Sequence, residues 1–182
     1  MRPTFEEVNM RYAFEVARRS TCLRKSQVDG SQMNVGCVIV DAEFRRVLAS
    51  GYNGNAASLP NTCDDPHSAG ACGCIHAEAN AVISCVESRK TDKIVFTTHQ
   101  PCPTCAKYLI QLGGVRRVYY ARPYRLTQGL DHLIAAGIPV KQYDVPCRAC
   151  SIESEIGTED NPHPVPLRFH TCNARLVASS GI

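Results

Sequence analysis

The sequence predicts an α/β fold, a three-layer α/β/α sandwich in which helices cover both faces of a five-stranded mixed sheet. Stretches with apolar residues at helical spacing alternate with short apolar runs typical of strands, in the order α-β-β-α-β-α-β-α-β. Glycines close several of the helical stretches, as at Gly113, Gly114 and Gly137. This alternation is typical of one sheet sandwiched between helices.

The individual elements follow from local patterns. The first helix is predicted to begin at Thr4, since Thr4 and Glu7 match the capping-box pattern, and to continue through about Ser20. Residues 22–34 and 51–73 lack periodicity, and the second segment is rich in Gly, Asn, Pro and Asp, which predicts a long loop. The remaining predicted elements are a hairpin of strands at 35–40 and 46–50, helices at 76–88, 104–112 and 127–136, and strands at 93–98, 115–121 and 139–145.

The composition limits the possible domain organisation and binding partners of the protein. The 182 residues, 44% of them hydrophobic, fit one domain over residues 1–145 and an extension over residues 146–182. The acidic start lacks an apolar run and no stretch reaches membrane-spanning length, so we expect a cytoplasmic protein without a membrane partner. Eleven cysteines, an odd number, then favour thiolates and metal binding over a disulfide framework. A net charge of only +3, with scattered arginine pairs, argues against a nucleic acid polymer as partner.

Two short motifs carry the chemistry, H-x-E at residues 76–78 and P-C-x-x-C at residues 101–105. A catalytic zinc takes three protein ligands and keeps a fourth position for water, whose pKa it lowers to roughly 7. The predicted ligands are His76, Cys102 and Cys105. Glu78 is the predicted catalytic residue, a free carboxylate that carries protons beside the metal. This combined pattern is the known signature of zinc-dependent nucleobase deaminases.

Each half of the pattern also has an ordinary explanation. A lone C-x-x-C occurs as a redox pair or as half of a structural zinc knuckle, and a lone H-x-E is common by chance. The joint pattern is more specific, because the prolines, the intervening strand and both helix starts agree with one zinc site. A catalytically silent zinc-binding module is a further alternative. Glu78 argues against it, since a purely structural site has no use for an unliganded glutamate.

Seven segments together carry a family resemblance: residues 19–24, 35–41, 51–54, 76–82, 101–107, 118–124 and 136–138. They resemble the deoxycytidylate (dCMP) deaminase family, which has the cytidine deaminase-like fold, over about residues 5–145. Gly51-Tyr-Asn-Gly54 together with the His-Ala-Glu-x-Asn-Ala segment from His76 points most narrowly to that family. The resemblance implies zinc-dependent hydrolysis of dCMP to dUMP and ammonia, supplying dUMP for thymidylate synthesis.

The resemblance also implies substrate contacts and regulation. Asn53 would contact the nucleotide, the Ala77 backbone would contact the base, and Tyr120 or Tyr124 would line the pocket. A simple turn at Asn53 and strand-edge packing of the tyrosines are the alternatives. Many family members are hexamers activated by dCTP and inhibited by dTTP, so a regulated homo-oligomer is expected. Deaminases of free cytidine, of guanine, or of a base in tRNA or single-stranded DNA are the alternative functions.

Some members of that family carry a second, structural zinc, and the loops before residue 76 offer donors for one. The candidate ligands are Cys22, Cys63 and His67, with Cys72 or Cys74 as the fourth. A closed tetrahedral zinc would fix a long polar loop that has little core of its own. Free surface thiols are the alternative.

The remaining cysteines and histidines are assigned from their surroundings. The extension contains four further possible donors, Cys147, Cys150, His170 and Cys172. They match a zinc knuckle, but we favour a disordered or loosely docked tail with incidental cysteines. We expect Cys37 and Cys85 to be small core residues, and His99 and His132 to be structural.

Overall fold

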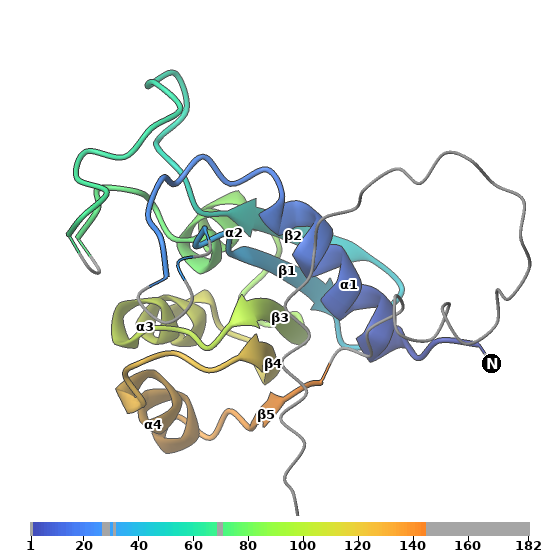
Figure 1. Cartoon of the computed structure of the whole chain (residues 1–182). Coiled ribbons are helices and arrows are strands. Elements are labelled where there is room, and N and C mark those ends of the chain that lie inside the picture. The colour runs from blue at the N-terminus through green and yellow to red at the C-terminus, as the bar shows by residue number, and fades with distance from the viewer. Residues whose placement is uncertain (1, 27–29, 31, 69–70, 145–182) are drawn as a thin grey trace, which may run out of the picture. The chain divides into compact units, whose positions relative to one another are not determined.

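In the computed structural model, which describes residues 2–26, 30, 32–68 and 71–144, five strands form one sheet and four helices cover it (Figure 1). In chain order the elements are α1 (Phe5–Ala17), β1 (Gly36–Asp41), β2 (Val47–Tyr52), α2 (Ala77–Ser84), β3 (Lys93–His99), α3 (Pro103–Leu112), β4 (Val115–Arg122), α4 (Gln128–Ala135) and β5 (Val140–Gln142). The predicted order of helices and strands is confirmed. The predicted extension, with Cys147, Cys150, His170 and Cys172, lies outside the described residues.

The sheet is mixed, with the strand order β2-β1-β3-β4-β5. Strand β1 runs antiparallel to both β2 and β3, whereas β3, β4 and β5 run parallel to one another. Cys37 at the start of β1 pairs with Thr97 near the end of β3. The segment that enters β1 and the segment that leaves β3 therefore meet at the same end of the sheet, which is where the candidate site lies.

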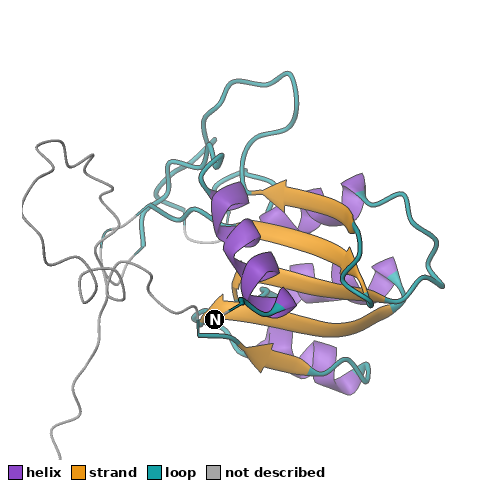
Figure 2. Ribbon diagram, turned by 90° about the vertical axis from the view of Figure 1, so that its right-hand side faces the viewer, coloured by secondary structure: helices purple, strands orange, loops and turns teal. Residues whose placement is uncertain are grey.

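The helices form two layers, with α1 on one face of the sheet and α2, α3 and α4 on the other (Figure 2). Side chains of β1 alternate between the two cores, because successive residues of a strand point to opposite faces. Val38 and Val40 pack with Met10 of α1, whereas Cys37 and Ile39 pack in the core that contains buried residues of α2, α3 and α4. The predicted three-layer sandwich is thus confirmed.

The ends of the elements show where the sequence patterns are accurate. Thr4 caps α1 as predicted, because its Oγ1 accepts a hydrogen bond from the backbone N–H of Glu7 at 3.2 Å. Helix α2 ends at Ser84 instead of about Ser88, since the next residue, Cys85, has an extended backbone with ψ of 106°. Strand β5 is also shorter than predicted and pairs with β4 only over residues 140–142.

The helices in the described part of the chain are short. The longest of them, α1, has 13 residues, and none there combines the length and the apolar character of a membrane span.

Candidate active site and metal centres

His76 lies immediately before the first turn of α2. Its backbone is extended, with φ of −69° and ψ of 155°, and Ala77 is the first helical residue. The turn packs closely on β2, because a Cβ atom on Gly51 would lie 2.4 Å from the carbonyl oxygen of Ala77. Only a residue without a side chain allows this approach. The bridge between Gly54 and Ile75 holds the chain just before His76.

Cys102 and Cys105 lie at the start of α3, and Cys102 is three residues beyond the end of β3. Cys102 is the cap residue, and its Sγ accepts a hydrogen bond from the backbone N–H of Cys105 at 3.5 Å. Pro103 occupies the first helical position, where the absence of an N–H leaves no hydrogen bond unmade. A spacing of three residues on a helix places the two cysteines on the same side of the turn.

The structure brings His76, Cys102 and Cys105 together in one group whose donor atoms all lie within 4.8 Å of one another. Nδ1 of His76 lies 3.5 Å from Sγ of Cys102 and 3.4 Å from Sγ of Cys105. A tetrahedral zinc with ordinary bond lengths separates a nitrogen ligand from a sulfur ligand by roughly 3.5 Å. The donor set therefore fits zinc, and three protein donors leave a fourth coordination position open.

Glu78 lies in the first turn of α2 and lines the same pocket as His76 and Cys102. Its side chain is buried, with 4% exposed, and it is not a member of the donor group. Burial raises the pKa of Glu78 above the ordinary value for a glutamate. A buried carboxyl group with a raised pKa is suited to take up and release a proton during catalysis.

The two thiols of this group differ in their ionisation. A side-chain hydrogen bond from the Cys105 thiol to Sγ of Cys102 lowers the pKa of Cys102 to about 4 and raises the pKa of Cys105. The hydrogen bond with Cys102 also raises the pKa of His76. At neutral pH the Cys102 side chain is therefore a thiolate, the form in which cysteine binds metals.

Asn53 follows β2 and lines the pocket as a buried residue. Its Oδ1 accepts a hydrogen bond from the backbone N–H of Val35 at 2.8 Å, and its Nδ2 donates to the carbonyl oxygen of Met33 at 2.7 Å. Both ends of the amide thus bind the segment that enters β1. Asn53 fixes this wall of the pocket.

The other residues expected to contact substrate divide into two groups. Ala77 and Tyr124 line the pocket. Tyr120 is not among the described residues that line the pocket. It lies within β4, where it pairs with Thr97 of β3 and Gln142 of β5. The structure therefore does not support Tyr120 as a pocket residue.

Sequence reasoning misses two apolar residues that line the pocket, Met33 and Val35, and three polar ones, Arg24, His99 and Gln100. Gln100 is buried; its Nε2 donates to the carbonyl oxygen of Leu126 at 2.7 Å, and its Oε1 accepts from the backbone N–H of Tyr124 at 3.4 Å. It thereby ties the loop after β4 to the end of β3. The sequence position of Gln100 could have predicted this role, because Gln100 directly follows the parallel strand β3 and ligands of α/β proteins bind beyond the carboxyl ends of parallel strands.

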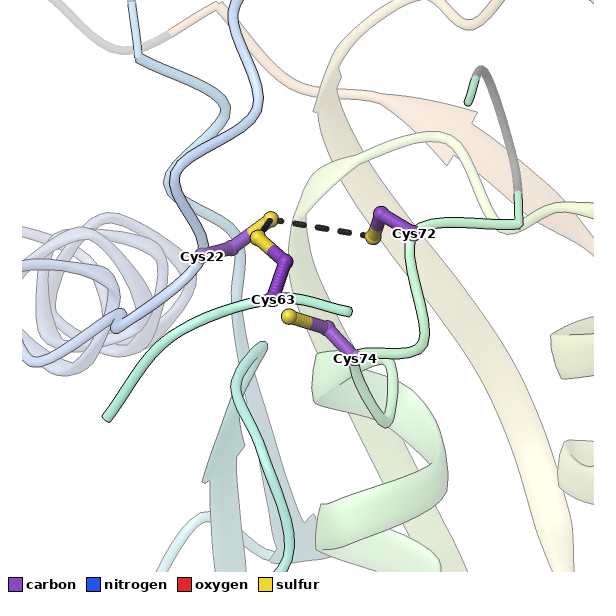
Figure 3. A group of neighbouring side chains, drawn as sticks. All are labelled: Cys22, Cys63, Cys72 and Cys74. Atoms are coloured by element: carbon purple, nitrogen blue, oxygen red, sulfur yellow. Dashed lines mark hydrogen bonds between the residues drawn. The ribbon is translucent and has the colours of Figure 1, made fainter. Parts of the chain in front are cut away.

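A second group of donors in the described residues consists of four thiols, Cys22, Cys63, Cys72 and Cys74 (Figure 3). Their sulfur atoms point toward one another, and Sγ of Cys22 lies 3.7 Å from that of Cys63 and 3.9 Å from that of Cys72. A tetrahedral zinc separates two sulfur ligands by roughly 3.8 Å, whereas a disulfide bond measures about 2.05 Å. The four free thiols therefore fit a closed zinc site.

His67 is not a member of this group, which corrects the expected ligand set. Its side chain is exposed, and its backbone N–H donates to Oδ1 of Asp65 at 2.9 Å in an outer turn of the loop. Cys72 and Cys74 both contribute instead. Gly73 between them has φ of +81°, which other residues rarely adopt, and this turn allows both sulfurs to reach the group.

The backbone also stabilises the four-cysteine group. The N–H of Leu23 donates to Sγ of Cys63 at 2.9 Å. Burial would raise the pKa of Cys63, but this hydrogen bond and those from neighbouring groups outweigh it, so the pKa is lowered. Burial raises the pKa of Cys22 to about 11. The group thus contains one thiol, Cys63, that readily becomes a thiolate and another, Cys22, that ionises less easily.

Known proteins are similar to this chain in sequence. The family model for the "Cytidine and deoxycytidylate deaminase zinc-binding region" matches residues 4–122. The chain is 32% identical to deoxycytidylate deaminase of Schizosaccharomyces pombe over 158 residues, which are 80% of this chain and 46% of that protein. It is 31% identical to deoxycytidylate deaminase of Mycobacterium phage D29 over 135 residues, which are 66% of this chain and 97% of that protein. The chain thus spans about half the length of the yeast relative and nearly all of the phage relative.

Solved structures share the fold. The crystal structure of dCMP deaminase from the cyanophage S-TIM5 in complex with dCMP and dUMP matches with a TM-score of 0.64 and 32% identity. The match covers 79% of this chain and 99% of the cyanophage chain. The predicted cytidine deaminase-like fold is therefore confirmed.

Proposed function

The chain belongs to the cytidine and deoxycytidylate deaminase family, and we propose that it deaminates dCMP by hydrolysis to give dUMP and ammonia. The observation that carries this proposal is the buried carboxyl group of Glu78 in one pocket with a zinc donor set. The choice of dCMP is supported by the relatives named deoxycytidylate deaminase and by the cyanophage structure with dCMP and dUMP. In this role the protein would supply dUMP for thymidylate synthesis.

His76, Cys102 and Cys105 would hold the catalytic zinc. When bound, zinc supplies Lewis acidity, which activates water for attack at neutral pH. The starts of α2 and α3 fix the donors before the metal arrives, because both helices pack on the same face of the sheet. Helix starts also stabilise negative charge on Cys102 and Cys105.

Glu78 would move the protons. As a carboxylate it accepts a proton from the attacking water, and as a carboxylic acid it donates that proton to N3 of the cytosine ring. It then accepts the proton of the hydroxyl group formed at C4 and donates it to the departing amino group, which leaves as ammonia. Burial suits both tasks, since it raises the pKa of Glu78 and so makes the carboxyl group a better proton acceptor that can hold the proton between the two transfers. A general acid-base group of this kind contributes roughly 100- to 10,000-fold to the rate.

The rest of the pocket would position the base and exclude water. The Ala77 backbone lies beside Glu78 at the start of α2 and would contact the base. Tyr124 would cover the pocket from the loop after β4, where Gln100 holds it. Asn53 would contact the nucleotide while its amide keeps the pocket wall in place.

The four-cysteine group would hold a second, structural zinc. Its donors come from the loop after α1 and from the long loop before α2, so one metal would connect two segments that are far apart in the sequence. Four thiolates complete a tetrahedral shell and leave no position for water. This zinc would stabilise the loops and take no part in the chemistry. Regulation by dCTP and dTTP, assembly into hexamers and a cytoplasmic location are further predictions of the proposal.

A substrate panel tests the proposed function. Purified zinc-loaded protein is incubated with dCMP, cytidine, dCTP and guanine, and ammonia release is measured. We expect release from dCMP well above that from the other three. Release from cytidine or guanine but not from dCMP would replace the proposal with a nucleoside or base deaminase, and release from none would favour a silent zinc-binding module.

A further inference from the structure

Arg24 is the only arginine or lysine among the described residues that line the pocket of Glu78. A nucleotide brings a phosphate with up to two negative charges into such a pocket. Removing this charge from water is costly unless a cation pairs with it. Arginine suits the task, because its planar guanidinium donates two parallel hydrogen bonds to a phosphate.

The charge of Arg24 is not used within the described structure. Other arginines form ion pairs with carboxylates, such as Arg11 with Glu7 and Arg116 with Asp92. In the part of the chain that the structure describes, the guanidinium of Arg24 makes no ion pair, although the residue is half-buried. A half-buried arginine without an anion is suited to receive one from a ligand.

The backbone around Arg24 is held in place on both sides. Cys22, two residues earlier, belongs to the four-cysteine group, and the N–H of Leu23 donates to Sγ of Cys63. The carbonyl oxygen of Arg24 accepts a hydrogen bond from the N–H of Met33 at 2.9 Å, and Lys25 forms a bridge with Gln32. The four-cysteine group therefore fixes the segment that presents Arg24 to the pocket.

We propose that Arg24 binds the 5′-phosphate of the substrate and so gives the enzyme its preference for nucleotides over nucleosides. This inference rests on the proposed function, because it assigns a role within the same pocket. It also gives the four-cysteine group a second task. By holding the backbone at residues 22–24, that group positions the residue that selects the substrate class.

The test is the variant Arg24→Gln, which removes the charge and keeps most of the side-chain stem. The preference for dCMP over deoxycytidine, measured as the ratio of their kcat/KM values, should fall about 10- to 150-fold, the effect of losing one charge-assisted hydrogen-bonded contact. The loss should appear mainly in KM. Calorimetric titration should show the same loss for dUMP relative to deoxyuridine, a measurement that needs no turnover.

Two further variants complete the design. Arg24→Lys keeps the charge and should recover part of the preference. Arg45→Gln changes an exposed arginine in the turn between β1 and β2, at the other end of the sheet, and should leave the ratio unchanged.

An unchanged ratio in Arg24→Gln, or an equal loss for nucleotide and nucleoside, would overturn the inference, since a merely structural arginine affects both alike. If the wild-type protein releases no ammonia from dCMP, the proposed function fails. The titrations with dUMP and deoxyuridine still decide whether Arg24 binds a phosphate.

Discussion

The two groups of metal donors contain the same kinds of atoms but differ in what surrounds them. His76, Cys102 and Cys105 lie at the starts of two helices that pack on the sheet, and a free carboxyl group is buried in the same pocket. The four cysteines lie in loops and form a group without a carboxylate or an imidazole. Three donors beside an acid make a reactive site, whereas four thiols make a closed one.

The comparison also shows how each group depends on the rest of the protein. The first group is held by core packing, because buried residues of α2 and α3 share one hydrophobic cluster with strands β1, β3 and β4. Among the described residues, the second lies in a small apolar cluster made of the four cysteines themselves. We therefore expect loss of the metal from the first group to abolish activity, and loss of the metal from the four-cysteine group to reduce the order of the loops.

The largest effect is expected for Cys105→Ser. This variant should lose one zinc per chain and its ammonia release should fall to background, because a ligand of the open site is gone. The zinc in the four-cysteine group should remain. Metal analysis together with the ammonia assay checks this. Cys85→Ser is the matched control, since Cys85 is a half-buried cysteine outside both groups, and it should keep both metals.

Cys63→Ser should have an intermediate effect. It should also lose one zinc, but the active-site metal should stay and turnover should decline far less than in Cys105→Ser. With a loss of about 2 kcal/mol in the free energy of unfolding, the midpoint of thermal unfolding should drop by roughly 4–8 °C. Limited proteolysis should then cut within residues 53–75. Complete loss of activity in a Cys63→Ser sample that retains the active-site zinc would show that catalysis also depends on the four-cysteine group.

The smallest effect is expected for His67→Ala. Its side chain is exposed and does not belong to the four-cysteine group, so the zinc content and the unfolding midpoint should equal those of the wild type. Loss of one zinc per chain in this variant would restore His67 as a ligand and contradict the all-cysteine site.

The first group could be predicted from sequence because its residues follow local rules. Short spacings and helix starts place His76 and Glu78 on one turn and Cys102 and Cys105 on another. Strand β3, which lies between these two turns in the sequence, brings them together. The order of helices and strands was predictable for the same reason. The end of α2 was not, since Cys85 leaves the helix although the apolar pattern continues.

The loops could be predicted only in part. Cys22 and Cys72 are 50 residues apart in sequence, and no periodic pattern fixes how such loops fold. The positive φ of Gly73 allows Cys72 and Cys74 both to enter the group, whereas His67 lies in an outer turn of the same loop and is not a member. Arg24 and Gln100 escaped sequence reasoning because they reach the pocket only through these long-range arrangements.

The most direct test of the central claim is the ammonia release of Glu78→Gln, measured against dCMP with the zinc content of the same sample. This substitution removes the proton carrier and leaves every metal donor in place. We predict about two zinc ions per chain and a rate lower by roughly 100- to 10,000-fold. Wild-type turnover in a fully zinc-loaded Glu78→Gln sample would contradict the proton-transfer role of Glu78. It would also contradict the distinction between a reactive metal site beside an acid and a closed site of four thiols.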